Sequence, residues 1–397
     1  MTANAAAAAA AATSRPAKLE WSQPIWHSLE ADPGLADYDM IGAEQLVLTK
    51  NSSILSFAEA TKCAPGALGC EDNAGHHDII VKRSDDGGAS FGKAVLVHSE
   101  SNATAQIVIG NAAAVMDEST GRIYIFMCRN NTDVLLSHSD DNGDSWATVK
   151  DVTAVLKRPD WGWIATTFSG IQLKRQPASS GRNGRLVVCC DHQDHYDQVN
   201  GNTTWSYSHV IISDDAGKTW RIGGNSSRTT NECAIAELAN GTIVMNSRNY
   251  VGVKGVLPGV GTHTVHRAIS WSADGGDSFT PAYFPPSLPE SIVEGAMTTD
   301  AAGKMLVFTH PANPHNRDHE TVYSSIDAGV TWEPALLLDA NYSSYSGIIR
   351  LPNGSYAVQY NTGSTHMHRC NTPPEVNGSF VGCGAVFAVV TFLWPLQ

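Results

Sequence analysis

The sequence is short of charge, of basic residues and of long apolar runs, and each shortage excludes a class of protein. Charged residues make up 16% of the 397 residues and hydrophobic residues 42%, which is a globular rather than a disordered composition. The formal net charge of −13 argues against nucleic acid as the main partner, because phosphate binding needs basic patches. The apolar segment 384–396 is too short to span a membrane and contains Pro395, so we expect no membrane span.

The N-terminal segment has few features of a secretory signal. It holds an alanine run at residues 5–12, without a basic start or a bulky apolar centre. We therefore expect residues 1–20 to form a disordered Ala-rich tail and residues 21–397 to form a single domain. The chain also carries many N-x-[ST] sequons, at Asn51, Asn102, Asn130, Asn202, Asn225, Asn240, Asn341, Asn353 and Asn377. They indicate either a secreted or lumenal protein whose signal peptide is not present in this chain, or a surface rich in Asn, Ser and Thr.

The eight cysteines give weak support to a secreted or lumenal location. Cys63 and Cys70 bracket a short Gly/Pro loop, and Cys370 and Cys383 bracket another, so each pair could close a disulfide. Zinc is the alternative, but the spacings do not match paired C-x2-C knuckles. We expect neither a metal nor a cofactor.

A turn motif of the form Ser-x-Asp-x-Gly-x-x-(Trp/Phe), the Asp box, recurs along the chain. Its copies start 55, 74, 59 and 53 residues apart, and strand-like runs precede nearly every copy. Five copies make chance an inadequate explanation. They are Ser84-Asp86-Gly88-Phe91, Ser139-Asp141-Gly143-Trp146, Ser213-Asp215-Gly217-Trp220, Ser272-Asp274-Gly276-Phe279 and Ser325-Asp327-Gly329-Trp332.

The residue types of the Asp box suit a tight hairpin turn. The Asp side chain can accept hydrogen bonds from backbone N–H groups, Gly supplies positive φ, and the aromatic ring can pack back under the turn. A calcium loop is the alternative, but each copy has too few carboxylates. One hairpin per ~50–60 residues, without a long amphipathic helix, is typical of a propeller. We therefore expect an all-β fold, a six-bladed β-propeller of four-stranded antiparallel sheets with Asp-box hairpins.

Segments between the boxes carry a more specific resemblance, because Asp boxes occur in sialidases and in several unrelated proteins. Residues 230–234, Thr-Asn-Glu-Cys-Ala, and residues 244–250, Val-Met-Asn-Ser-Arg-Asn-Tyr, resemble paired segments of sialidases. Over residues 38–360 the chain thus resembles the sialidase (neuraminidase) superfamily. The resemblance implies a retaining exo-glycosidase that removes terminal α-linked sialic acid, or a related 2-keto-3-deoxy ulosonic acid such as KDN, from a glycoconjugate or oligosaccharide.

The resemblance makes Tyr345 the nucleophile and Glu232 its base. A sialic acid carries a carboxylate on its anomeric carbon, so an anionic nucleophile would approach against repulsion. A tyrosine that loses its proton to a nearby glutamate as it attacks avoids this repulsion. The residues alone would favour a surface loop tyrosine at position 345.

Three arginines hold the substrate carboxylate in sialidases, and two of them are found here as Arg248 and Arg317. The third should lie near the N-terminus, where Gly42 or a neighbour replaces it, and a further family arginine is replaced by Thr61. Lys62 is a candidate substitute for the missing cation.

The resemblance places the acid/base, an aspartate, in the loop of residues 61–77. Asp72 is the candidate, with Glu71 as its rival and a solvated acidic pair as the alternative reading. Residues 293–296, Val-Glu-Gly-Ala, replace a Cys-Gln-Gly-Ser segment and add Glu294 to the expected substrate-binding residues. His192 is expected to line the pocket, with an ordinary surface position as the alternative, and metal binding by the His-rich stretch 191–197 is the less favoured reading.

Two other functions stay open. The altered arginine set could belong to a related exo-glycosidase with a different terminal sugar. The scaffold could also serve as a carbohydrate-binding propeller without turnover, although a lectin has no need for a tyrosine–glutamate pair.

Overall fold

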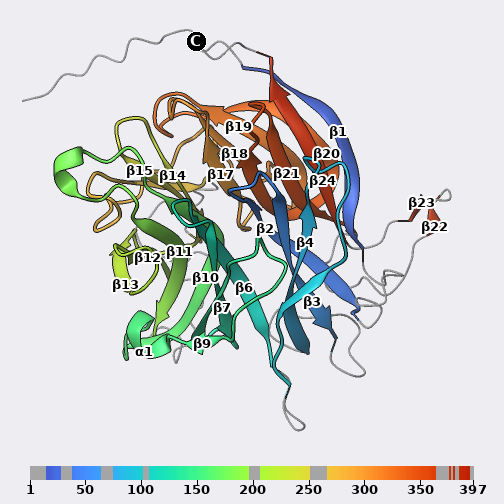
Figure 1. The fold of residues 1–397 in the computed structure, drawn as a ribbon. Helices are drawn as coiled ribbons and strands as arrows, with labels where there is room; N and C mark the ends of the chain where they lie inside the picture. Colours follow the sequence, from blue (N-terminus) through green and yellow to red (C-terminus); the bar gives the residue numbers. More distant parts are fainter. Residues whose placement is uncertain are drawn as a thin grey trace, which may run out of the picture.

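The computed structural model describes residues 15–27, 38–63, 75–101, 107–195, 206–250, 266–363, 375–376, 379–380 and 384–393. Nearly all regular structure in these residues is β-strand (Figure 1). The elements are β1 (Ala17–His27), β2 (Met40–Leu48), β3 (Ile54–Lys62), β4 (His76–Ser84), β5 (Val95–His98), β6 (Ile109–Asp117), β7 (Arg122–Arg129), β8 (Asp133–Ser139), β9 (Lys150–Asp151), α1 (Thr153–Leu156), β10 (Trp161–Gln172), the 3₁₀ turn η1 (Ala178–Ser180), β11 (Leu186–Asp194), β12 (Ser206–Ser213), β13 (Arg221–Asn225), β14 (Thr230–Glu237), β15 (Ile243–Asn249), β16 (Ala268–Ser272), β17 (Ala296–Thr299), β18 (Leu306–Pro311), β19 (Asp318–Ser325), β20 (Glu333–Arg350), β21 (Tyr356–Thr362), β22 (Glu375–Val376), β23 (Ser379–Phe380) and β24 (Gly384–Phe392).

The strands form antiparallel sheets made mostly of consecutive segments. Three sheets have four strands each, in the orders β2-β3-β4-β5, β6-β7-β8-β9 and β10-β11-β12-β13. A three-stranded sheet follows in the order β14-β15-β16, and a seven-stranded sheet has the order β1-β24-β21-β20-β19-β18-β17. Such up-and-down sheets are the units from which propellers are built.

The sheets pack around a common centre. Their inner strands contact one another in a closed order, β2, β6, β10, β14, β17, β20 and again β2. Apolar clusters fill the space between neighbouring sheets: one joins Phe57 of β3 to Ile125 of β7, and the next joins Phe126 of β7 to Val188 of β11. The fold is therefore all-β and propeller-like, as the sequence predicts.

The Asp boxes form the predicted turns, as the third copy shows. The Ser213 hydroxyl donates to Asp215 at 2.9 Å and accepts the Gly217 N–H at 2.8 Å. Asp215 accepts from the backbone N–H of Thr219 at 2.8 Å, and Gly217 has φ +80°. Trp220 Nε1 donates back to the Gly217 carbonyl at 3.0 Å. The aspartates of the boxes are thus turn-forming residues.

The aromatic residue of each box also fixes its turn to the neighbouring sheet. The Trp220 ring lies edge-on to Phe126 of β7, with 4.7 Å between ring centroids. Phe91 meets Phe387 of β24 in the same way at 5.2 Å. The boxes therefore connect sheets as well as strands.

The first and last described strands lie side by side (Figure 1). β1 pairs with β24 from Ala17↔Phe392 to His27↔Gly384. Residues 17–20, expected to belong to the tail, are thus part of a strand, because they complete the hydrogen bonding of β24. Residues 1–14 lie outside the described part of the chain.

Cys63 is disulfide-bonded. Its expected partner Cys70 lies outside the described residues, as do Cys370 and Cys383. In the part of the chain that the structure covers, no helix combines the length and apolar character needed to cross a membrane.

Candidate active site

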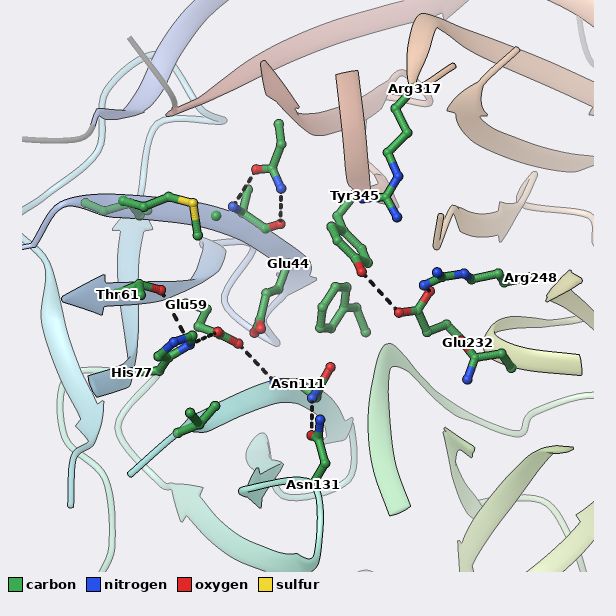
Figure 2. Close-up of a pocket in the computed structure, with 18 of the residues that line it drawn as sticks. Glu44, Glu59, Thr61, His77, Asn111, Asn131, Glu232, Arg248, Arg317 and Tyr345 are labelled. Atoms are coloured by element: carbon green, nitrogen blue, oxygen red, sulfur yellow. Dashed lines mark hydrogen bonds and ion pairs between the residues drawn. The ribbon is translucent and has the colours of Figure 1, made fainter. Parts of the chain in front are cut away.

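A cavity of about 440 Å³ opens where the inner strands meet. Its lining comes from the inner strands β2, β6, β10, β14 and β20 and, to about the same extent, from the strands and connections beside them. A volume of this size is in the range of small-ligand sites. Its walls carry Tyr345, Glu232, Arg248 and Arg317 on one side, and Glu44, Glu59, Thr61, His77 and Asn111 on the other (Figure 2).

Tyr345 and Arg248 share the carboxylate of Glu232. The Tyr345 hydroxyl donates to Glu232 Oε1 at 3.2 Å, and Arg248 Nη1 donates to Glu232 Oε2 at 2.6 Å. Tyr345 comes from β20, Glu232 from β14 and Arg248 from β15. The structure therefore brings together the predicted nucleophile, its predicted base and one predicted arginine.

Arg317 lies on the same side of the cavity. Its Nη2 donates to the Ile292 carbonyl at 2.8 Å, and its guanidinium carbon is 5.7 Å from the centre of the Tyr345 ring. Phe168 meets the Tyr345 ring nearly edge-on, with 5.5 Å between centroids. Two guanidinium groups thus flank the tyrosine, so this side of the cavity can hold an anionic group.

The main charges on this side of the cavity are those of the Glu232–Arg248 ion pair. Burial works against the charge of Arg248, but the carboxylate of Glu232 together with Tyr250 and Tyr345 raises the pKa of Arg248 well above its usual value. Burial, followed by repulsion from Glu232, raises the pKa of Asp191 well above its usual range. Asp191 is therefore harder to ionise than an exposed aspartate.

Glu294 does not line the cavity, contrary to the prediction. Its residue is 1% exposed, and neither carboxyl oxygen has a hydrogen-bond partner among the described residues. Burial and the negative charge of Glu232 raise its pKa well above the usual range. A neutral carboxyl behind the cavity wall cannot contact a ligand, although it still adds polarity near Glu232.

The expected gap in the arginine set lies on the opposite wall. Gly42 and Thr61 both line the cavity, as expected for positions that have lost a cation. A Cβ atom on Gly42 would meet only Asn361 Nδ2, at 3.7 Å, so the position has room for a side chain. Lys62 does not take the place of the arginine, because its Nζ lies 5.0 Å above the ring of Tyr38 and Lys62 is not part of the lining.

Two glutamates and a histidine of the cavity were not among the predicted site residues: Glu44, Glu59 and His77. His77 Nδ1 and Glu59 Oε1 form a hydrogen bond, and Glu59 Oε2 accepts the Asn111 N–H at 3.3 Å. The segment Phe57-Ala58-Glu59-Ala60 resembles a family segment, which was the available signal for Glu59. Nothing in the sequence pointed to Glu44.

The predictions for His192 and Asp72 have different outcomes. His192 is not in the cavity lining: its ring stacks on Trp161 at 3.7 Å, and its Nδ1 lies 3.1 Å from His209 Nδ1. It belongs to β11, and the rings that it contacts come from β10 and β12 of the same sheet, so its side chain packs against its own sheet. Asp72 and its rival Glu71 lie outside the described residues, and the acid/base assignment stays a prediction.

Irregular strand pairing positions the cavity residues. β14 shifts register between Thr230 and Cys233, and β20 shifts between Ser343 and Ser346, around Glu232 and Tyr345 respectively. β2 shifts between Ala43 and Leu46, around Glu44. A bulge interrupts the alternation of side chains and re-aims one of them. The inner strands thus turn selected side chains toward the cavity.

The fold has Asp-box turns, and its central cavity carries a tyrosine–carboxylate pair beside two arginines. These features define a class of protein, and the sequence matches a family of that class. Residues 69–358 match the family of BNR repeat-like domains. The chain therefore belongs to the BNR repeat-like domain family.

Its relatives include sialidases of bacteria and mammals. The chain is 29% identical over 323 residues to the sialidase of Micromonospora viridifaciens, covering 74% of this chain and 46% of that protein. It is 24% identical over 327 residues to the sialidase of Bacteroides fragilis, covering 74% and 55%. Human sialidase-4 is 25% identical over 295 residues, covering 67% and 54%. The chain spans about half the length of these relatives.

Solved structures share the fold. The Hadza microbial sialidase Hz136 superposes with a TM-score of 0.69 at 22% identity, covering 85% of this chain and 66% of that one. The intramolecular trans-sialidase from Ruminococcus gnavus gives 0.67 at 12% identity, covering 90% and 95%. These similarities support the propeller-like architecture.

Proposed function

We propose that this protein is a retaining exo-glycosidase of the sialidase type, acting on glycoconjugates or oligosaccharides that end in α-linked sialic acid or a related 2-keto-3-deoxy ulosonic acid such as KDN. The observation that carries the proposal is the 3.2 Å hydrogen bond from Tyr345 to Glu232 inside a cavity flanked by two arginines. The sialidase relatives support the same reaction class.

In the first step the Tyr345 oxygen attacks the anomeric carbon while its proton passes to Glu232. The bond to the leaving group breaks, and a proton donor converts the leaving oxygen to a hydroxyl. Asp72 remains the predicted donor. In the second step water attacks the tyrosyl-linked sugar, its proton returns to the donor, and Tyr345 recovers its own proton from Glu232.

The arginines suit a substrate that carries a carboxylate. Arg317 and Arg248 present guanidinium groups on the side of the cavity that carries Tyr345, and each can form charge-assisted hydrogen bonds with a carboxylate. They would also hold the sugar as positive charge develops at the anomeric carbon. A neutral tyrosine is compatible with this anionic substrate, whereas a carboxylate nucleophile would be repelled.

The Tyr345→Phe variant tests the proposal. Removing the hydroxyl deletes the nucleophile, so we expect hydrolysis of an aryl α-glycoside of KDN or sialic acid to fall by about a thousandfold or more. Fluorescence of the released aryl group measures the rate, and Tyr283→Phe, at a site outside the cavity lining, is the matched control. Equal turnover by the wild type and Tyr345→Phe would show that the role given to Tyr345 is wrong.

A second candidate is a related exo-glycosidase with a different terminal sugar. It is favoured by Gly42 and Thr61, which replace cations, and by the carboxyl groups of Glu44 and Glu59 on the same wall. Comparing aryl glycosides of sialic acid, KDN and neutral sugars separates the two candidates. A protein that binds these sugars but turns none of them over would be a lectin.

We also propose that the propeller has six blades. Residues up to Tyr342 of β20 pair with β19, and residues from Ser343 pair with β21. Dividing the seven-stranded sheet at this point gives two blades that share one long strand, and these join the four other blades. The closed order of inner-strand contacts supports this count. A crystal structure would test it directly.

A secreted or lumenal location is a further proposal. The sequon asparagines within the described residues are all exposed, as glycosylation requires: Asn51, Asn130, Asn225, Asn240, Asn341 and Asn353. Expression through a secretory pathway should therefore yield a protein whose mass falls on treatment with an N-glycosidase. An unchanged mass would argue against this location.

A further inference from the structure

The strand that carries Glu232 is not held in regular pairing at that residue. β14 pairs with β15 in regular register from Cys233 onward, but the register shifts between Thr230 and Cys233. Asn231 and Glu232 lie in this interruption, here called the β14 bulge, and both line the cavity. Because a bulge disrupts the ladder of hydrogen bonds, contacts from outside the strand pair must set the direction of the Glu232 side chain.

The neighbouring sheet β10-β11-β12-β13 fixes the main chain of the β14 bulge. On one side, the Thr167 hydroxyl of β10 donates to the Cys233 carbonyl at 2.9 Å. On the other side, the Ser208 N–H of β12 donates to the Thr230 hydroxyl at 2.9 Å, and the Ser208 hydroxyl donates to the Asn231 carbonyl. These bonds hold the backbone of the bulge, and they leave the orientation of its side chains to other contacts.

Asp191 of β11 makes a contact with a side chain of the bulge. Asn231 Nδ2 donates to Asp191 Oδ2, and both residues are buried. Asp191 is itself paired on both sides, opposite Ala165 of β10 and Ser208 of β12, so it is a rigid support. Burial, and then the charge of Glu232, raises the pKa of Asp191, as expected for two carboxyl groups near each other.

Two groups in the cavity compete for the Glu232 carboxylate (Figure 2). Its ion pair with Arg248 is short, at 2.6 Å, whereas the bond from the Tyr345 hydroxyl is 3.2 Å long. The second distance exceeds the roughly 2.7–2.8 Å usual between a hydroxyl and an oxygen acceptor. A small displacement of Glu232 toward Arg248 would therefore break the contact with Tyr345 and keep the ion pair.

We propose that Asp191 is a positioning residue, which through its hydrogen bond with Asn231 holds the β14 bulge so that Glu232 stays within reach of the Tyr345 hydroxyl. The inference rests on the proposed function in that Glu232 is the base that accepts the proton of Tyr345. It adds a fully buried residue, outside the cavity lining, on which the rate of nucleophilic attack depends.

Substitutions of Asp191 test the proposal with an aryl α-glycoside of KDN or sialic acid. Asp191→Ala removes the acceptor, and we expect kcat/KM to fall about 10- to 100-fold, as when a catalytic group is misplaced by about 1 Å. Asp191→Asn keeps an acceptor oxygen and should recover most of this loss. The dissociation constant of the free sugar, measured by calorimetry, should change by about threefold or less in either variant, because the groups that line the cavity remain.

A double-mutant cycle shows whether Asp191 acts through Asn231. Asn231→Ala removes the other half of the hydrogen bond and should lower kcat/KM by a similar factor, and the double variant should lose little more than either single variant. Asn231→Ala also keeps the test decisive if Asp191→Ala fails to fold. The matched control is Asp117→Ala, at a buried aspartate that binds Ser119 and Thr120 outside the cavity lining. It should lower the melting temperature and leave kcat/KM unchanged.

Crystal structures of the variants separate this proposal from the proposed function. In Asp191→Ala or Asn231→Ala the Glu232 carboxylate should lie beyond hydrogen-bonding distance of Tyr345, with its Arg248 ion pair retained. This displacement, together with a wild type that hydrolyses no glycoside, supports the positioning role and contradicts the glycosidase.

Three results would overturn the positioning role in an active enzyme. The first is a Glu232 carboxylate that stays on Tyr345 in Asp191→Ala, or full kcat/KM in that variant. The second is a double variant in which the two single losses multiply. The third is an Asp191→Asn variant as slow as Asp191→Ala. An unmoved Glu232 overturns the role in an inactive protein as well.

Discussion

Several buried carboxyl groups in this protein lack the usual charged partners, and Glu320 is the clearest. Its residue is fully buried, and its Oε1 accepts from the Thr309 hydroxyl at 2.6 Å. Burial raises its pKa to about 8, although hydrogen bonds from Thr309 and Ser343 work in the opposite direction. Glu320 therefore remains protonated in the folded protein at neutral pH.

This pKa gives a prediction for stability. A pKa that is higher in the folded protein than in the unfolded chain stabilises the fold at low pH, and this contribution is lost as the pH rises from about 4.5 toward 8. Glu320→Gln has the shape of the protonated acid and cannot ionise. Its melting temperature relative to the wild type should therefore increase between pH 5 and pH 9, reflecting up to a few kcal/mol. A difference that stays constant over this range would contradict the prediction.

At the scale of single residues, the sequence predicted the cavity only where a motif carried the information. Tyr345, Glu232 and Arg248 lie in segments that resemble known ones, and the structure brings them together. Glu294 was misplaced because adjacent residues in an extended chain can face opposite sides of a wall. Glu44 was missed because it lies at a bulge, where regular alternation gives no direction for the side chain.

The Asp-box hairpin is the element that the sequence predicted best, because all its interactions are local. The contact of the hairpin with the neighbouring sheet was harder to predict from the sequence, since it depends on which strand lies opposite the hairpin. Gly217 shows both parts: it has φ +80°, and a Cβ atom there would lie 2.2 Å from Cζ of Tyr124. The Tyr124 hydroxyl donates to the Ala216 carbonyl at 2.8 Å, so the ring cannot easily move away.

Alanine substitutions at two box glycines separate these contributions. In Gly87→Ala the only cost is that of placing an alanine at a φ of +74°, because nothing lies within 4 Å of its Cβ position. We expect a loss of about 1–2 kcal/mol for this variant. Gly217→Ala adds the clash with Tyr124, so its loss should be larger by about 1–3 kcal/mol. Urea unfolding measures both, and equal losses would mean that the contact between sheets has little weight.

At the scale of the whole molecule, neutral buried histidines make stability depend on pH. Burial, and then the charge of Arg158, lowers the pKa of His192 to about 3. Burial and the neighbouring His192 lower the pKa of His209 well below its usual value. The ring of His310 is buried in the same way, and its pKa is also lowered. These histidines take up protons on unfolding and not in the folded protein.

Stability should therefore fall as the pH drops from about 6.5 toward 3, because the unfolded chain binds more protons in this range. Each such histidine contributes up to about 1.4 kcal/mol per pH unit. His192→Gln should be less stable at pH 7, since it loses the stack on Trp161, but its stability should decline less steeply on acidification. Melting temperatures at several pH values test this, and parallel curves for variant and wild type would rule it out.

The pairing of β1 with β24 has a consequence for synthesis. Residues 17–27 are made before the other described strands, but their hydrogen-bonding partners, residues 384–392, are made only after the strands between them. Until then the edge of β1 stays open to other chains, and any sheet assembled earlier lacks its final neighbour. A newly made molecule thus cannot complete this pairing, or reach its native topology, until residue 392 has been made.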